Sequence, residues 1–201
     1  MEHNNLENIL NMVASGDMSV DDAVSRLRLQ PYEDIGYAKV DHHRVIRQGV
    51  AETIYGEGKT AEQIAGIIRS MKDAGQPLVL ATRTDAAKAE SVKSLLGEDC
   101  ADLAYNEAAR ILTVGEFPEA TGLGKVVIAT GGTSDIPVAE EAAVTAEALG
   151  NDVVRLYDVG VAGIHRLLDN KDYIMNASVV IAIAGMEGAL ASVIGGIADC
   201  P

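Results

Sequence analysis

A short stretch near residue 130 carries the side chains best suited to binding a phosphate group. Residues 126–128 are continuous and β-branched, which predicts a buried strand. Gly131 and Gly132 then open a turn, and three polar residues follow: Thr133, Ser134 and Asp135. Pro137 falls in the first turn of the next predicted helix, where the missing N–H of proline is tolerated. Backbone N–H groups at such a helix start bind anions, and an ordinary turn with Asp135 as helix N-cap fits the same residues.

Other reactive side chains also follow predicted strands in the second half of the chain. Strand-like runs at residues 153–157 and 179–184 each precede a helix-like segment. Strands that alternate with helices predict a parallel sheet, in which ligands bind at the carboxyl ends of the strands. The candidate residues at these ends are Asp158, His165, Arg166 and Glu187. We therefore expect one site built from three strand ends, with Glu187 in the first turn of its helix.

Arg83 is a further candidate, because it directly follows the apolar run at residues 78–82. A guanidinium group at a strand end could hold a phosphate or a carboxylate. A surface ion pair with one of the many acidic residues is an equally good interpretation.

Two motifs in the first third of the chain resemble functional sites but lack residues that such sites require. The glycines at 56 and 58 precede Lys59 and Thr60, but Thr53 stands where a phosphate-binding loop needs a glycine. Thr60 and Gln63 instead predict a capping box at the start of a helix. Residues 1–30 predict two short helices from the helical spacing of their apolar residues.

The triplet Asp41-His42-His43 resembles the metal ligands of phosphoesterases of the Asp-His-His class. A dinuclear site also needs several further aspartates at strand ends, and the sequence has no such set nearby. A polar turn, or a contact to a charged ligand, fits the triplet better, and we expect no metal site in the protein itself.

A linker rich in glycine at residues 115–124 marks the expected domain boundary. We expect a smaller helical and α+β N-terminal domain at residues 1–120. Residues 121–201 should form an α/β domain, a three-layer arrangement with a parallel sheet between helices.

Composition excludes several classes of partner. The net charge of -14 disfavours nucleic acid, whose binding depends on basic side chains. Two cysteines without paired spacing indicate a reducing compartment, and the first residues do not resemble a signal peptide. No apolar run approaches the roughly 18 residues of a membrane-spanning helix. We expect a cytoplasmic protein with no membrane partner.

From about Asp41 onward the sequence resembles the LarB family of pyridinium-3,5-biscarboxylic acid mononucleotide synthases. The matching stretches are residues 41–49, 132–142, 157–166 and 184–190. They begin Asp-His-His-Arg, Gly-Thr-Ser-Asp, Tyr-Asp-Val-Gly and Ala-Gly-Met-Glu. The second domain also looks like the catalytic domain of aminoimidazole ribonucleotide carboxylase, PurE. The resemblance implies a PurE- or flavodoxin-like fold for that domain.

The resemblance also implies a reaction. The pyridinium ring of nicotinic acid adenine dinucleotide is carboxylated by carbon dioxide or bicarbonate, and cleavage of the phosphoanhydride then releases AMP, an early step toward the nickel-pincer nucleotide. A pyridinium ring is electron-poor, so a thiolate must first add to it and convert it into an enamine. By the family match Cys200 is this nucleophile, with His165 and Glu187 as the other catalytic residues.

The same match implies that the substrate is bound by ten residues: Gly132, Thr133, Ser134, Asp135, Asp158, Arg166, His42, His43, Arg44 and Arg47. Mg²⁺ is expected to accompany the substrate pyrophosphate, and a homo-oligomer between dimer and octamer is expected by analogy. The related families continue past the position of Cys200, so we expect a truncated sequence with impaired activity. Alternatives are an aminoimidazole ribonucleotide carboxylase or mutase, and a nucleotide-binding module without catalysis.

Overall fold

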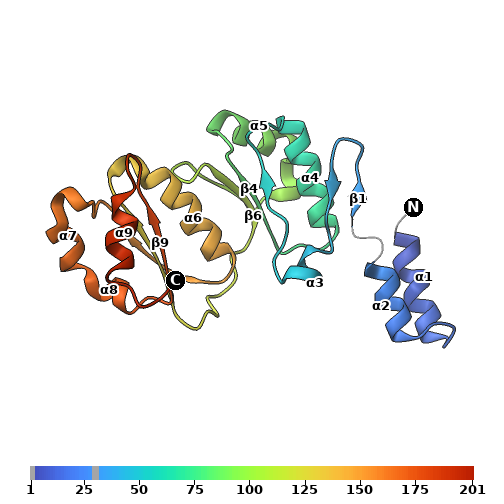
Figure 1. Ribbon diagram of the computed structural model, residues 1–201. Helices are drawn as coiled ribbons and strands as arrows, with labels where there is room; N and C mark the ends of the chain where they lie inside the picture. Colours follow the sequence, from blue (N-terminus) through green and yellow to red (C-terminus); the bar gives the residue numbers. More distant parts are fainter. Residues whose placement is uncertain (1–2, 29–31) are drawn as a thin grey trace. The chain divides into compact units, whose positions relative to one another are not determined.

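The computed structural model describes residues 3–28 and 32–201 and divides into two compact units, residues 1–52 and 53–201 (Figure 1). This division differs from the expected boundary after residue 120, which falls inside the second unit, in the linker between its two sheets. None of the described helices is long and apolar enough to cross a membrane.

The first unit begins with the two predicted helices, α1 (His3–Ala14) and α2 (Val20–Arg28). Their contact is a small apolar cluster of Ile9, Met18 and Ala23. The Ser19 hydroxyl oxygen accepts a hydrogen bond of 3.0 Å from the Asp22 N–H and so caps α2. A two-stranded antiparallel sheet and a short helix follow: β1 (Glu33–Asp34), β2 (Lys39–Val40) and α3 (Arg44–Gln48).

The second unit opens with a four-stranded sheet in the order β3-β4-β6-β5. Its strands are β3 (Ile54–Tyr55), β4 (Leu78–Thr82), β5 (Leu103–Asn106) and β6 (Ile111–Gly115). Strands β3 and β4 are parallel, and the other pairs are antiparallel. The helices of this part are α4 (Ala61–Asp73), α5 (Ala86–Leu96) and the 3₁₀ helix η1 (Gly97–Cys100). The predicted capping box of Thr60 and Gln63 is present at the start of α4.

A three-stranded sheet follows the linker and confirms the predicted parallel arrangement. Its strands are β7 (Lys125–Thr130), β8 (Asp152–Leu156) and β9 (Val179–Ile183), in the order β8-β7-β9. Both neighbours of β7 run parallel to it, so all three carboxyl ends lie at one edge of the sheet. The connections contain α6 (Ile136–Ala148), α7 (Ile164–Asp169), α8 (Lys171–Met175) and α9 (Ala189–Gly195), and the 3₁₀ helices η2 (Thr133–Asp135) and η3 (Val161–Gly163).

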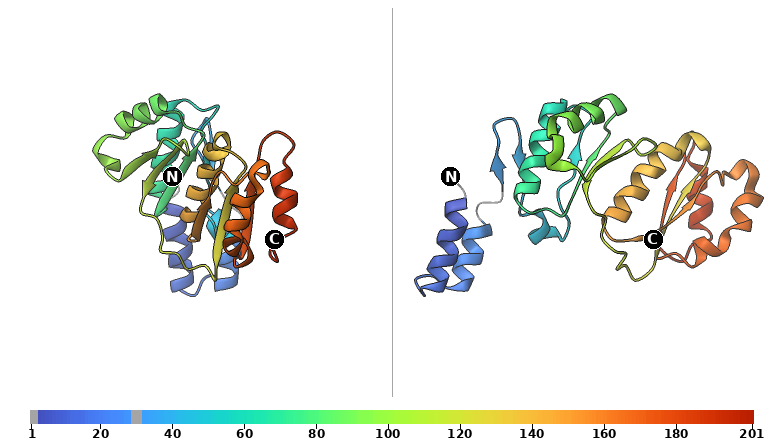
Figure 2. Two further views of the ribbon diagram at one scale, coloured as in Figure 1. Left: turned by 90° about the vertical axis from the view of Figure 1, so that its left-hand side faces the viewer. Right: turned by 180° about the vertical axis from the view of Figure 1, so that it is seen from behind.

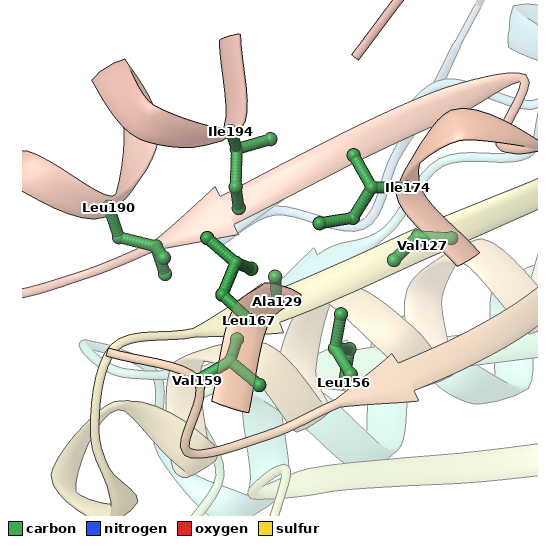
Figure 3. Packing of buried hydrophobic residues seen from close by; sticks show 8 residues of the cluster. All are labelled: Val127, Ala129, Leu156, Val159, Leu167, Ile174, Leu190 and Ile194. Atoms are coloured by element: carbon green, nitrogen blue, oxygen red, sulfur yellow. The ribbon is translucent and has the colours of Figure 1, made fainter. Parts of the chain in front are cut away.

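Helices cover both faces of the three-stranded sheet, which gives the three expected layers (Figures 1 and 2). On one face α6 packs Ala139 and Ala143 against Ile128 of β7. On the other face α7, α8 and α9 pack on the alternate strand residues (Figure 3). The cluster in that view is Val127, Ala129, Leu156, Val159, Leu167, Ile174, Leu190 and Ile194. Because successive strand side chains point to opposite faces, β7 contributes to both cores.

Candidate functional site

A pocket of about 220 Å³ lies at the carboxyl ends of β7, β8 and β9. Its lining comes from the three loops that follow these strands and from the start of α9. The residues that line it are Gly131, Gly132, Ser134, Asp135, Gly160, Val161, Ala162, Arg166, Ala184, Gly185, Met186, Glu187, Ala189 and Leu190. Ser134, Arg166 and Glu187, which the sequence places at three different strand ends, therefore share one concavity.

The loop after β7 provides backbone donors and a hydroxyl group. Ser134 is exposed and lines the pocket, while Thr133 is exposed but lies outside the lining. The N–H groups of Thr133 and Ser134 stand at the start of η2, where helical geometry offers them no carbonyl partner. Such N–H groups are the part of the predicted anion site that an incoming ligand could use.

Asp135 does not use its carboxylate to cap α6, although it occupies the N-cap position. Its Oδ2 accepts a hydrogen bond of 2.9 Å from the Gly132 N–H, and its Oδ1 accepts one of 3.1 Å from the Gly185 N–H. The carboxylate is therefore held by backbone groups of two loops, and the N–H of Gly132 is already satisfied.

The loop after β8 is fixed by a residue that sequence reasoning missed, Thr130 at the end of β7. Its buried Oγ1 accepts a hydrogen bond of 2.9 Å from the Asp158 N–H, and its carbonyl accepts one of 2.9 Å from Val159. Gly160 packs so closely on Gly131 that a Cβ atom would lie 2.4 Å from the Gly131 carbonyl oxygen. In the sequence, only the position of Thr130 at the end of a strand and before two glycines could have indicated this role. The same position is equally typical of an ordinary strand residue.

Asp158 and Arg166 form an ion pair, with 2.7 Å between Asp158 Oδ2 and Arg166 Nη1. Asp158 has a φ of 57°, a left-handed conformation that is uncommon outside glycine and that recurs at functional sites. Arg166 reaches the pocket from α7, and its side chain is partly exposed. Asp158 thus orients the guanidinium group at the pocket wall.

His165 does not line the pocket, although it precedes Arg166 directly. Its side chain is exposed, and no hydrogen bond or ion pair involves it among the described residues. Neighbouring helix residues point about 100° apart, so only one of the two can face the pocket from α7.

Glu187 lines the pocket from the loop that precedes α9. The sequence predicted it in the first turn of the helix. Gly188, with a φ of 69°, is the N-cap of α9, so the helix starts only at Ala189. Met186 before it also has a left-handed φ of 56°. The Glu187 carboxylate is exposed and makes no hydrogen bond or ion pair within the described part of the chain.

Cys200 does not line this pocket, and its expected role as nucleophile stays a prediction. The carbonyl of the adjacent Pro201 accepts a hydrogen bond of 2.9 Å from the N–H of Val180, near the amino end of β9. The pocket begins at Ala184, four residues further along the strand direction, or roughly 13 Å at the usual rise. The family match placed Cys200 by its position after the Glu187 helix, but a chain that leaves α9 returns to the opposite edge of a parallel sheet.

The polar motif of the first unit is internally paired in part, whereas the Arg44 Nε atom is buried without a hydrogen-bond partner among the described residues. Asp41 accepts hydrogen bonds from Arg47 at 3.1 and 2.5 Å, and the Glu33 carboxylate lies 3.1 Å from His42 Nε2. The Arg47 hydrogen bonds hold the pKa of the Asp41 carboxyl below its ordinary value. The other two expected binding residues, His43 and Arg44, stand at the start of α3, with His43 as its N-cap.

Arg83 forms an ion pair with Glu141, which agrees with one of the two interpretations of this residue. Its Nε donates to both carboxylate oxygens of Glu141 on α6, at 2.9 and 2.7 Å. No group of three or more histidine, cysteine, aspartate or glutamate side chains within residues 3–28 and 32–201 is placed to hold a metal ion.

A parallel sheet with a glycine turn, a guanidinium group and a carboxylate in one pocket at its strand ends defines an α/β protein with a pocket at the carboxyl ends of the strands. Comparison with known proteins identifies the family. The family model described as the LarB/PurE-like N-terminal domain matches residues 32–116. An uncharacterized protein of Methanocaldococcus jannaschii is 38% identical over 208 aligned positions, which cover 98% of this chain and 78% of the relative. The chain therefore belongs to the LarB/PurE-like family.

Proposed function

We propose that this protein is a carboxylase-type enzyme that acts on the ring of a nucleotide bound at the carboxyl edge of β7, β8 and β9. Membership of the LarB/PurE-like family supports carboxylase chemistry. The observation that carries the proposal is that Ser134, Arg166 and Glu187 line one pocket although they come from three separate strand ends. Ligands of parallel α/β sheets bind at this edge.

The phosphate of the nucleotide would bind at the start of η2. The Thr133 and Ser134 N–H groups and the Ser134 hydroxyl can donate hydrogen bonds to it. Arg166 adds a positive charge at the same wall of the pocket. Since Asp158 takes one of its nitrogen atoms at 2.7 Å, the remaining guanidinium N–H groups can donate to a phosphate or a ring carboxylate.

Glu187 would accept the proton that carboxylation releases. A new bond forms between a nucleophilic ring carbon and the carbon of carbon dioxide, and the C–H bond at that ring carbon must then break. The electron pair of this bond returns to the ring, and the proton passes to a carboxylate. Glu187 fits this role because it lines the pocket and has no internal partner among the described residues.

We propose nicotinic acid adenine dinucleotide as the substrate, with carbon dioxide or bicarbonate as donor. For this ring, a thiolate from outside the described pocket would first add to the pyridinium and make the ring carbon nucleophilic, and its expulsion after loss of the proton would restore the aromatic ring. The anhydride of the dinucleotide would then be cleaved to release AMP, with Mg²⁺ bound by the pyrophosphate oxygens, since Asp135 and Asp158 already have partners. His42, His43, Arg44 and Arg47 belong to the first unit and have no part in this proposal. Assembly into a homo-oligomer stays a prediction, which light scattering would test.

A second candidate substrate is aminoimidazole ribonucleotide, and the position of the cysteines favours it. Neither Cys100, buried in η1, nor Cys200, near the amino end of β9, lines the pocket. A pyridinium ring needs an added nucleophile before it can attack carbon dioxide, whereas an aminoimidazole is already an enamine.

Incubation with ¹³C-bicarbonate, Mg²⁺ and each substrate in turn tests both candidates by mass spectrometry. We expect a labelled carboxyl group on the pyridinium mononucleotide together with free AMP. Label on aminoimidazole ribonucleotide alone would select the second candidate. If neither compound gains a carboxyl group while both bind, the protein is a nucleotide-binding module and the proposal is wrong.

A further inference from the structure

The carboxylate of Asp135 joins two loops that lie 50 residues apart in the sequence. One oxygen accepts from Gly132 N–H, in the turn after β7, and the other accepts from Gly185 N–H, in the loop after β9. Both donors are backbone groups, so each bond fixes the path of the chain and not merely a side chain.

The loops are shaped around this carboxylate. A Cβ atom built on Gly131 would lie 3.2 Å from Asp135 Oδ2, and one built on Gly185 would lie 3.4 Å from Oδ1. The first distance is tighter than ordinary side-chain contacts. At Gly131 the Asp135 carboxylate and the Cβ atom of Ala184 therefore crowd the space that a side chain would occupy, whereas Gly185 packs on Oδ1 at an ordinary contact distance.

The two bonded glycines each precede a residue of the proposed site by two positions. Gly132 leads to Ser134, and Gly185 leads to Glu187. The main chain also ties the strands together here, because Gly131 N–H donates to the Ile183 carbonyl at 2.9 Å. That bond lies at the strand ends, whereas the Asp135 bridge lies in the loops beyond them. Glu187 stands in one of these loops, between the left-handed residues Met186 and Gly188.

We infer that Asp135 is a positioning residue that fixes the turn of Glu187 relative to the phosphate-binding turn. Its carboxylate is satisfied by the protein itself, so it differs in kind from Ser134 and Arg166, which keep donors for a ligand. The bridge stands on the two hydrogen bonds alone. Its consequence for catalysis rests on the proposed function.

Amide hydrogen exchange of the full chain without substrate tests the bridge directly. In the unaltered protein the Gly185 amide should exchange slowly for a residue in an exposed loop. Asp135→Ala should accelerate exchange at both Gly132 and Gly185 about tenfold or more, because hydrogen bonds to a charged acceptor are lost. Asp152→Ala, which removes an exposed carboxylate paired with Lys125, is the control and should change neither amide. Fast exchange at Gly185 in the unaltered protein would overturn the inference without reference to any variant.

Kinetics of the nearly isosteric Asp135→Asn then separates positioning from direct binding. One N–H acceptor becomes a donor, so the Glu187 turn should shift and kcat should fall about tenfold or more while KM changes less. A rise in KM with unchanged kcat would identify Asp135 as a direct ligand of the substrate and overturn the inference. Because hydrogen exchange needs no substrate, failure of the proposed reaction and failure of the bridge give different results.

Discussion

The three-stranded sheet has one pocket at the amino ends of its strands, here the amino edge, and one at their carboxyl ends, the carboxyl edge. The larger of the two is not the candidate site. The pocket at the amino edge has a volume of about 350 Å³, against about 220 Å³ at the carboxyl edge. It is lined by Gly124, Lys125, Val127, Val154, Asp172, Tyr173 and Asn176. Two of its polar groups have internal partners: Lys125 lies 3.8 Å from Asp152, and Asn176 Nδ2 donates to the Asp172 carbonyl at 2.8 Å. Pocket volume alone therefore does not locate the site.

The backbone differs between the edges in the same sense. The carboxyl edge contains two left-handed residues that are not glycine, Asp158 and Met186. Each such conformation costs on the order of 1 kcal/mol or more, and it persists only where the surroundings enforce it. Thr130, Asp135 and Gly160 supply these surroundings through hydrogen bonds and close packing. Strain, free donors and an unpaired carboxylate thus occur together at one edge of the sheet.

The largest expected effect is that of Glu187→Gln at the carboxyl edge. Removal of the proton acceptor should lower kcat for carboxylation by roughly 10²- to 10⁴-fold, with little change in the affinity for the nucleotide. Tyr173→Ala at the amino edge is the control and should leave the turnover rate unchanged. Equal loss in both variants would mean that the two pockets are not functionally distinct.

Arg166→Gln should weaken nucleotide binding. Loss of a charged donor at the phosphate is expected to raise the dissociation constant roughly 10- to 100-fold, as measured by calorimetry. Lys125→Gln removes one positive charge from the opposite edge and controls for the change in net charge. If the Lys125 variant binds as weakly as the Arg166 variant, general electrostatic attraction accounts for binding and the pocket does not.

Thr130→Val tests whether the carboxyl edge is held by side-chain hydrogen bonds. The nearly isosteric change leaves the Asp158 N–H without its acceptor, so the free energy of unfolding in urea should fall by about 1–3 kcal/mol. Thr113→Val is the matched control, since that buried hydroxyl makes only a long contact of 3.5 Å to the Ala104 carbonyl. A larger loss at Thr113 would contradict the prediction.

The smallest expected effect is a pH dependence at the carboxyl end of β8. Burial, and then the hydrogen bond to Glu140, raise the pKa of Tyr157. A raised pKa in the folded state means that this contribution to stability is complete below the ordinary tyrosine pKa of about 10 and is lost as the pH rises above it. Unfolding measured at increasing alkaline pH should show a loss of about 1 kcal/mol, which Tyr157→Phe removes. The Tyr173→Phe variant is the control and should keep the alkaline loss of stability. If the loss disappears in that variant, Tyr173 at the amino edge causes it and the prediction for Tyr157 is wrong.

Much of the parallel sheet could be predicted because its signals are local. The β-branched run at residues 126–128 is long enough to identify β7, and the spacing of glycines fixes where its turn begins. The capping box of Thr60 and Gln63 similarly determines the start of α4. Strand β3 has only two residues, and β5 alternates no clear apolar pattern, so neither could be predicted from propensity.

Within the site, the sequence predicted which strand ends matter but not which way each residue points. Ser134, Arg166 and Glu187 line the pocket as the strand-end argument requires. His165 does not line the pocket, because helical rotation points it away from Arg166. Its catalytic role stays a prediction. Cys200 does not line the pocket, because its place was inferred from distance along the chain, whereas the return path from α9 leads to the amino end of β9. Its role as nucleophile stays a prediction. Asp135 was recognised as important, but its bond to Gly185 is a long-range contact that no local pattern contains.

The most direct test of the account is to map the amide chemical-shift changes of the ¹⁵N-labelled protein on addition of nicotinic acid adenine dinucleotide. We expect the largest changes on Gly132, Ser134, Arg166 and Glu187, at the carboxyl edge. Changes confined to Lys125, Val154 and Tyr173 at the amino edge would contradict it.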